Sequence, residues 1–184
     1  AFRLDPNVPL VVPEINAGDV KLHHGIISNP NCSTIITLTA INALRKLSPI
    51  RDMVVSTYQA VSGAGAGGPI ELQNEVDALR AGKSYAPKVF AHQIAYNVIP
   101  QIGGEQCDGY TSEEMKLQNE GRKILHLPDM NVSCTCVRVP VVRSHSISAA
   151  VHFVHHISVD EARAAIAAAP GCRLVDDLDA LQYP

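Results

Sequence analysis

The chain has 184 residues, of which 46% are hydrophobic and 18% charged, and its net charge is −3 at pH 7. This composition is typical of one large globular domain and excludes a disordered chain. The negative charge argues against nucleic acid or an anionic membrane as a standing partner, and no segment approaches the ~20 apolar residues that span a bilayer. The five cysteines are odd in number and scattered. They predict a reducing, cytoplasmic location without a disulfide framework.

A single cysteine stands where the first long helix is expected to begin. Cys32 follows Asn29-Pro30-Asn31, a turn-and-cap composition, and apolar residues then recur at helical spacing as far as Leu47. A thiol in a first helical turn faces unpaired N–H groups and the positive end of the helix dipole, which favour the nucleophilic thiolate. The pattern alone leaves two interpretations open, a reactive nucleophile and a small buried cysteine that happens to begin a helix.

The later elements are predicted from periodicity, caps and breakers. In chain order we expect a strand over 50–57, a glycine-rich turn over 58–68, a helix over 70–79, an irregular segment over 83–104, a helix over 111–125 opened by a Thr111–Glu114 capping box, β runs over 131–142 and 145–156, a helix over 160–169 and a strand beginning at 173–175. The two β runs are expected to pair antiparallel across Arg143-Ser144. The predicted fold class is therefore α/β of the α+β type, a mixed, largely antiparallel sheet with helices on one face.

Several polar residues stand where core packing does not explain them. Gln59 ends the first strand, His145 follows a turn, and Arg138 interrupts an apolar run. Glu113 and Lys116 are three residues apart and so share one helix face. With the cysteine, these residues supply a nucleophile, an acid/base group, an orienting amide and fixed charges for an ionic substrate. Spacing alone also permits a structural histidine and a solvated Glu–Lys pair.

Neither the histidine cluster nor the cysteine pair predicts a metal centre. On one strand, His152 and His156 would share a face and His155 would point the other way, so no three ligands converge. Cys134 and Cys136 share a strand face without the second cysteine pair of a zinc site. We interpret these two cysteines as packing residues at an interface.

Several long blocks resemble the aspartate-β-semialdehyde dehydrogenase family, in the family's order, from residue 1 to about residue 156. The blocks are Val8-Pro-Leu-Val-Val-Pro-Glu-Ile-Asn16, Ser28-Asn-Pro-Asn-Cys-Ser-Thr-Ile35, Ser56-Thr-Tyr-Gln-Ala-Val-Ser-Gly-Ala-Gly65, Asn97-Val-Ile-Pro100, Glu113-Glu-Met-Lys116, Glu120-Gly-Arg-Lys-Ile124, Arg138-Val-Pro140 and Arg143-Ser-His145.

The resemblance implies a role for each matching residue. It implies Cys32 as nucleophile, His145 as acid/base, Gln59 as the amide that orients the thiohemiacetal, Arg138 and Glu113 as partners of the substrate carboxylate and ammonium, Arg3, Asn31 and Lys116 as the phosphate-binding group, and Ser62 and Gly63 as the loop near the nicotinamide of NADP.

The resemblance also implies an activity and an organisation. The activity is the reversible, NADP-dependent reductive dephosphorylation of L-4-aspartyl phosphate to L-aspartate 4-semialdehyde through a cysteine thioester, in lysine, threonine and methionine biosynthesis. The fold would resemble the catalytic domain of glyceraldehyde-3-phosphate-dehydrogenase-like enzymes and form a homodimer. Residues 1–25 would be the exit segment of a nucleotide-binding domain that the chain lacks, and residues 26–184 the catalytic and dimerisation domain. Such a fragment is expected to be inactive.

Two other functions share part of this pattern. N-acetyl-γ-glutamyl-phosphate reductase also uses a cysteine and an acyl phosphate, but Glu113 argues against it because an acetylated amine has no charge to pair. A non-catalytic paralogue kept for assembly is disfavoured by the joint presence of Cys32, Gln59, Arg138 and His145.

Overall fold

The computed structural model describes residues 2–184, so Ala1, the first residue of the expected exit segment, lies outside the described residues. The chain divides into two compact units. Unit 1 contains Ala1–Met53, Asn119–Asn131 and Val151–Pro184, and unit 2 contains Val54–Gln118 and Val132–Ala150. Among residues 2–184, no helix is long and apolar enough to cross a membrane.

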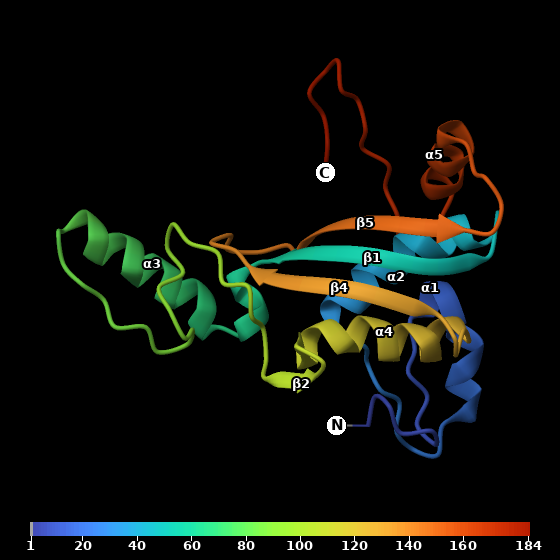
Figure 1. The fold of residues 1–184 in the computed structure, drawn as a ribbon, viewed down its shortest axis with the longest axis horizontal. Coiled ribbons are helices and arrows are strands. Elements are labelled where there is room, and N and C mark those ends of the chain that lie inside the picture. Colours follow the sequence, from blue (N-terminus) through green and yellow to red (C-terminus); the bar gives the residue numbers. More distant parts are fainter. Residues whose placement is uncertain (1) are drawn as a thin grey trace. The chain divides into compact units, whose positions relative to one another are not determined.

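A three-stranded sheet runs through the fold, with β1 (Ile50–Gln59) between β4 (Asn131–Arg138) and β5 (Ser146–Phe153). In Figure 1 the arrowheads of β1 and β4 point the same way and that of β5 points the opposite way. The sheet is therefore mixed, as expected, with one parallel and one antiparallel pairing.

The expected antiparallel pair of the two β runs is wrong, because β1 separates β4 from β5. After β4 the chain continues beside the end of β1 instead of turning back. Val139 N–H donates to the Gln59 carbonyl (3.0 Å), and Val61 N–H donates to the Val141 carbonyl (2.9 Å). The connection to β5 thus crosses the end of β1. Because β5 ends at Phe153, His155 and His156 lie beyond the strand, and the expected sharing of a face by His152 and His156 is also wrong.

Unit 1 is built around α2 (Cys32–Arg45), with α1 (Pro13–Asn16) and α5 (Val159–Ala167) packed against it. It also contains the 3-10 helix η1 (Ala17–Leu22) and the second half of α4 (Ser112–Leu125). Lys123 on α4 ties down the first residues of the chain, because its ammonium donates to three backbone carbonyls there, those of Arg3 (3.1 Å), Asp5 (2.6 Å) and Val8 (2.6 Å). The domain division at residue 25 stays a prediction.

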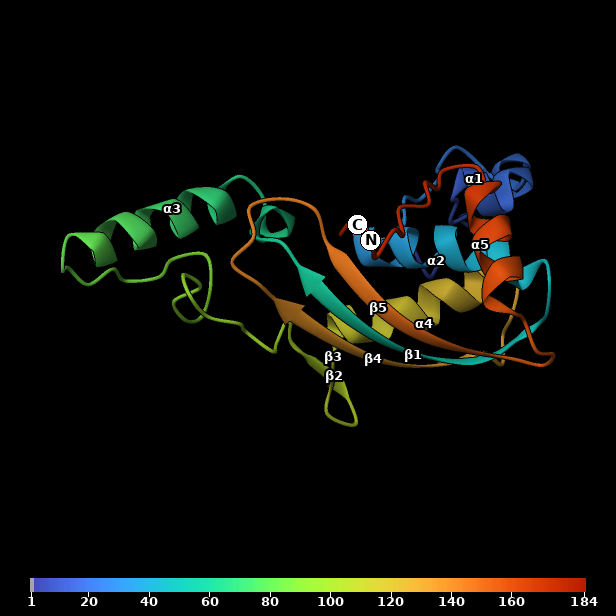
Figure 2. The ribbon, with the colours of Figure 1, turned by 90° about the horizontal axis from the view of Figure 1, so that it is seen from above.

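Unit 2 contains a short 3-10 helix, η2 (Val61–Ala64), then α3 (Gly67–Arg80) and a long irregular segment. Both Figure 1 and Figure 2 show this segment returning alongside α3. Its core consists of apolar residues from η2, α3 and the returning segment, namely Val61, Leu72, Ile94, Ala95 and Ile99. A small hairpin, β2 (Glu105–Cys107) with β3 (Tyr110–Thr111), precedes α4.

Most local predictions agree with the structure. Asn31 caps α2 through hydrogen bonds from the N–H groups of Ser33 and Thr34, and Thr111 with Glu114 forms the expected capping box at α4. The strand expected at 173–175 is wrong, because these residues are irregular in the described chain and the nearest bridge joins Asp177 and Gln182.

The backbone at Gly68 lies so close to the backbone of Val61 that no side chain fits between them. A Cβ at this position would lie 2.1 Å from the Val61 carbonyl oxygen, which is itself backbone and cannot rotate away. Gly68→Ala should therefore destabilise the protein by about 1–3 kcal/mol and lower the melting temperature by roughly 2–4 °C per kcal/mol. Calorimetry would measure the shift. Gly18→Ala is the matched control, because nothing lies within 4 Å of a Cβ there. Equal melting temperatures for the two variants would contradict the prediction.

Candidate active site

The predicted site residues fall into two groups, one in each unit, and each group is described by itself. Unit 1 contains Arg3, Asn31 and Cys32, and unit 2 contains Gln59, Ser62, Gly63, Glu113, Lys116, Arg138 and His145.

In unit 2, the backbone of Ala60 holds two of the predicted residues at once. Its carbonyl accepts a hydrogen bond from Nη1 of Arg138 (2.7 Å), and its N–H donates to Nδ1 of His145 (3.0 Å). Ala60 is fully buried, directly after β1. Arg138 ends β4, which pairs with β1, and the crossover after β4 brings His145 to the same residue. The predicted carboxylate partner and the predicted acid/base group therefore lie close together.

This arrangement fixes the state of His145. A backbone N–H can only donate, so Nδ1 must accept, and the neutral ring carries its hydrogen on Nε2. Burial and the positive charge of Arg138 lower the pKa of His145, while Glu113 acts in the opposite direction. The imidazole is therefore neutral at pH 7, with Nε2–H as its remaining hydrogen-bonding group.

Gly63 lies against both of these side chains. A Cβ here would lie 2.9 Å from Nη1 of Arg138 and 3.2 Å from Cε1 of His145. Gly63 is exposed and Ser62 half-buried, both within η2. The absence of a side chain at Gly63 leaves bare backbone beside the two polar groups, where a flat ring can approach closely.

A hydrogen-bond network connects the buried Gln59, through Glu113, to the partly exposed Lys116. Gln59 accepts from the Thr57 hydroxyl (2.9 Å) and donates to Oε1 of Glu113 (3.1 Å), while Lys116 donates to Oε2 of Glu113 (2.8 Å). Glu113 is 8% exposed. Glu113 and Lys116 therefore share one helix face, as expected, and their side chains form an ion pair. The network locks the amide of Gln59 in one orientation, since both of its ends are engaged.

The Arg138 side chain lines a cavity of about 350 Å³ in unit 2. The Arg138 backbone exchanges two hydrogen bonds with Ile99 (2.8 and 2.9 Å), and the Phe90 ring lies 5.9 Å from Cζ of Arg138. The side chain is 6% exposed. A buried guanidinium in a largely apolar cavity is suited to a planar anion such as a carboxylate.

In unit 1, Cys32 is exposed in the first turn of α2, where the sequence predicts it. Asn31 precedes it and is 7% exposed. Its side chain caps the helix, and its backbone N–H donates to Oε2 of Glu120 (2.7 Å). Arg3 also reaches Glu120, through Nη1 and Oε1 at 3.3 Å. The structure thus brings Arg3 and the residue before Cys32 to one carboxylate.

Sequence reasoning missed the part played by Glu120. This residue is 1% exposed, and its two oxygens orient both Arg3 and Asn31. A signal was present, because Glu113, Lys116 and Glu120 are spaced i, i+3, i+7 and so share one face of α4.

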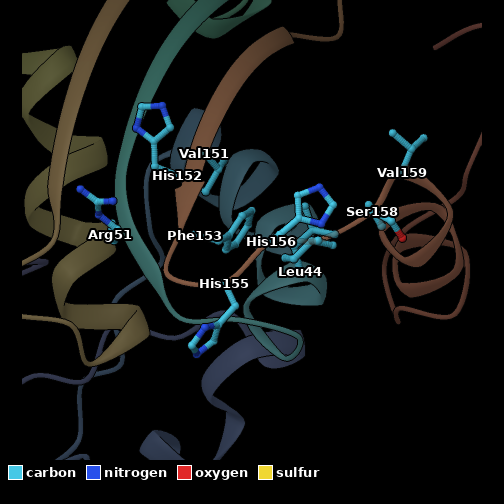
Figure 3. Close-up of a pocket in the computed structure, with 11 residues that line it drawn as sticks. Leu44, Arg51, Val151, His152, Phe153, His155, His156, Ser158 and Val159 are labelled. Carbon is cyan, nitrogen blue, oxygen red and sulfur yellow. The ribbon is translucent and has the colours of Figure 1, made fainter.

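The remaining histidines and cysteines do not form a ligand set. A cavity of about 600 Å³ in unit 1 is lined by His152, His155 and His156, but their rings point in different directions (Figure 3). His152 instead hydrogen-bonds Asp52. Across residues 2–184, no group of three or more His, Cys, Asp or Glu side chains could hold a metal ion. Cys134 and Cys136 are buried with their sulfurs 3.7 Å apart, and this contact together with burial raises the pKa of Cys134, so its thiol stays protonated.

Comparisons with known proteins give the family. Residues 41–184 match the family described as "Semialdehyde dehydrogenase, dimerisation domain". The chain is 43% identical to aspartate-semialdehyde dehydrogenase of Bacillus subtilis and 47% identical to that of Aquifex aeolicus, over its whole length but only 56% and 55% of theirs. In structure it is similar to aspartate semialdehyde dehydrogenase II of Vibrio cholerae complexed with ASA. That match has a TM-score of 0.91 and 39% identity, and it covers 92% of this chain and 51% of the other.

The chain belongs to the semialdehyde dehydrogenase family and contains its dimerisation domain. Its structural neighbours share its mixed α/β architecture, which confirms the predicted fold class. The chain spans about half the length of the relatives it matches.

The two charges beside His145 act on it in opposite directions, and each can be removed separately. Arg138→Gln should raise the pKa of His145, because the guanidinium lowers it and its loss also admits water. Glu113→Gln should lower that pKa further, because the carboxylate raises it. An NMR titration of the His145 ring signals, assigned by their loss in His145→Asn, would measure both changes. Shifts of the same sign would contradict the geometry.

Proposed function

We propose that this chain is the catalytic and dimerisation part of an NADP-dependent aspartate-semialdehyde dehydrogenase. The enzyme would reversibly convert L-4-aspartyl phosphate to L-aspartate 4-semialdehyde, a step in lysine, threonine and methionine biosynthesis. The observation that carries this proposal is the placement of a buried arginine and a neutral histidine on the two backbone groups of Ala60, beside the exposed backbone of Gly63. The relatives named aspartate-semialdehyde dehydrogenase and the Vibrio cholerae complex with ASA support it.

Cys32 is the nucleophile of the proposed reaction. Its thiolate adds to the aldehyde carbon, and the carbonyl oxygen takes up the negative charge of a thiohemiacetal. Loss of hydride from that carbon leaves a thioester on Cys32. A phosphate oxygen then attacks the thioester carbon, the C–S bond breaks, and Cys32 leaves as thiolate with β-aspartyl phosphate as the product.

His145 and Gln59 act on the oxygen of the thiohemiacetal. With Nδ1 engaged by Ala60, the neutral His145 ring offers Nε2–H to the developing charge, as an oxyanion donor does. Accepting a proton at Nε2 would require the ring to give up the hydrogen bond from Ala60. Gln59, held by Thr57 and Glu113, supplies a fixed amide dipole.

Arg138 and Glu113 recognise the two charges of the amino-acid end of the substrate. The fork of Arg138 binds the carboxylate through two oxygens, and Glu113 receives the ammonium. In the free protein Gln59 and Lys116 each donate to one oxygen of Glu113, so substrate binding would share or displace one of these contacts. Arg3, Asn31 and Lys116 are proposed to hold the phosphate, with Glu120 orienting the first two.

The described residues fit one end of NADP. Gly63 offers exposed backbone without a Cβ next to His145 and Arg138, and Ser62 precedes it in η2. When bound, NADP supplies the hydride acceptor. The five free cysteines are consistent with a reducing cytoplasm, and the match to a dimerisation domain supports a homodimer.

The proposal can be tested in a chimera that joins this chain to the segments of the Bacillus subtilis relative outside the aligned region. NADP reduction would be followed with phosphate and either aspartate semialdehyde or N-acetylglutamate semialdehyde. We expect turnover of the first aldehyde only, because Glu113 pairs with a free ammonium. Preference for the acetylated aldehyde would favour the reductase alternative, and turnover of neither would overturn the proposal.

Cys32→Ser in this chimera should reduce turnover to background while the protein stays folded. A hydroxyl at this position lacks the nucleophilicity of a thiolate, and its small change in volume leaves α2 intact. Steady-state assays and circular dichroism would check the two parts. Cys107→Ser is the matched control, since Cys107 is also exposed but plays no part in the mechanism. Substantial activity of Cys32→Ser would rule out the covalent route.

Arg138→Lys should lower kcat/KM for the aldehyde by about 10- to 100-fold, mainly through KM. The charge is kept, but one ammonium cannot replace the bidentate fork, nor reach both the Ala60 carbonyl and a carboxylate. The KM for phosphate should stay near that of the parent. Unchanged aldehyde kinetics would show that Arg138 does not contact the substrate.

A further inference from the structure

The wall of the Arg138 cavity is formed by backbone that has little regular structure. The cavity is lined by Arg138, Val89, Phe90, His92, Ile99 and Gln101, among others. Residues 83–98 contain neither helix nor strand. A segment of this kind is ordered only if its backbone N–H and C=O groups find partners elsewhere. What holds this segment therefore determines the shape of the cavity.

Glu71 on α3 fixes this segment through hydrogen bonds to its backbone. Its carboxylate accepts hydrogen bonds from three consecutive backbone N–H groups, with Lys88 (2.7 Å) and Val89 (2.8 Å) on Oε2 and Phe90 (3.0 Å) on Oε1. Glu71 is 2% exposed. Burial raises the pKa of Glu71, but the three backbone hydrogen bonds together outweigh it, so the pKa lies below its ordinary value and the group is ionised.

Two of the three amides that Glu71 binds belong to cavity-lining residues, Val89 and Phe90. The ring of Phe90 lies over the guanidinium of Arg138. A ring face in this position attracts the cation and limits where it can move. The connection from Glu71 to Arg138 therefore runs through one short stretch of backbone and one side chain.

We propose that Glu71 is a positioning residue for Arg138, whose carboxylate fixes the 88–90 backbone and so holds Phe90 and the cavity wall in the shape that binds the substrate carboxylate. This rests on the proposed function, in which Arg138 contacts that carboxylate. Glu71 itself contacts neither the substrate nor the cofactor.

The isosteric variant Glu71→Gln separates this role from simple packing. An amide has one oxygen, which can serve Lys88 and Val89, but its NH₂ would then face the Phe90 N–H, donor against donor. The hydrogen bond that is lost should therefore be that of Phe90, the residue whose ring contacts Arg138.

The matched control lies one helical turn further along α3. Glu75 is 1% exposed and accepts from Ile94 (2.8 Å) and Ala95 (2.7 Å), both on Oε2. Its Oε1 has no hydrogen-bond partner among the described residues. The amide of Glu75→Gln can therefore keep both hydrogen bonds and place NH₂ at the unpartnered position, and neither Ile94 nor Ala95 lines the cavity.

The kinetic test uses the chimera. We expect Glu71→Gln to raise the KM for aspartate semialdehyde about tenfold, with kcat within about twofold and the KM for phosphate unchanged, because loss of substrate binding raises KM without slowing chemistry. Glu75→Gln should match the parent. The proposal is overturned if the two variants have the same aldehyde KM, or if Glu71→Gln lowers kcat and both KM values change together.

A second test needs no turnover and uses the 184-residue chain. In Glu71→Gln, the amides of residues 88–90 should exchange with deuterium faster, and phenylglyoxal should label Arg138 faster relative to the exposed Arg143, whereas Glu75→Gln should change neither rate. If both rates stay unchanged in Glu71→Gln, the proposal for Glu71 fails, whatever the enzyme does. If the parent chimera is inactive but both rates rise, the proposed function fails and the positioning of Arg138 by Glu71 stands.

Discussion

Two backbone atoms of Ala60 organise the chemistry of unit 2. Its carbonyl, with partial negative charge, holds the guanidinium of Arg138, and its N–H requires the Nδ1 lone pair of His145. Each contact fixes one property, the orientation of a cation in the first case and the tautomer of an imidazole in the second. The first depends on the pairing of β4, which ends at Arg138, with β1. The second depends on the crossover after β4, which carries residues 139–145 past the end of β1.

Buried carboxylates that accept backbone hydrogen bonds recur through the structure. Glu71 and Glu75 order the irregular segment beside α3, Glu114 accepts from Thr111 and from the Cys136 N–H, and Glu120 binds Asn31 and Arg3. A carboxylate accepts several hydrogen bonds at once, so one such side chain can satisfy a run of backbone N–H groups. Irregular segments are thereby held without strands of their own.

The sequence predicts what is local and misses what is distant. The cap at Asn31, the Thr111–Glu114 box and the helix limits follow from residues a few positions apart. The hairpin turn at Asp108-Gly109, with φ of 51° and 80°, is equally local, because the dipeptide Asp-Gly favours a type I′ turn. By contrast, helical spacing places Glu120 on the face of Glu113 and Lys116 but does not indicate its partner Asn31, 89 residues away. The partners of Glu71, 17–19 residues further along the chain, are equally unmarked in the sequence. The predicted pairing of β4 with β5 is wrong for the same reason. Two β runs that are neighbours in the sequence suggest a hairpin, and only the long-range pairing with β1 separates them.

The interleaving of the two units has a consequence for how the protein is made. Unit 2 ends at Ala150, and unit 1 takes in Val151–Pro184, so neither is continuous. Leu38 and Val12, fully buried in the finished fold, leave the ribosome well before the residues that complete their unit. At typical elongation rates this interval is on the order of ten seconds. During that time these apolar side chains lack the rest of their unit, and transiently exposed apolar surface of this kind favours aggregation.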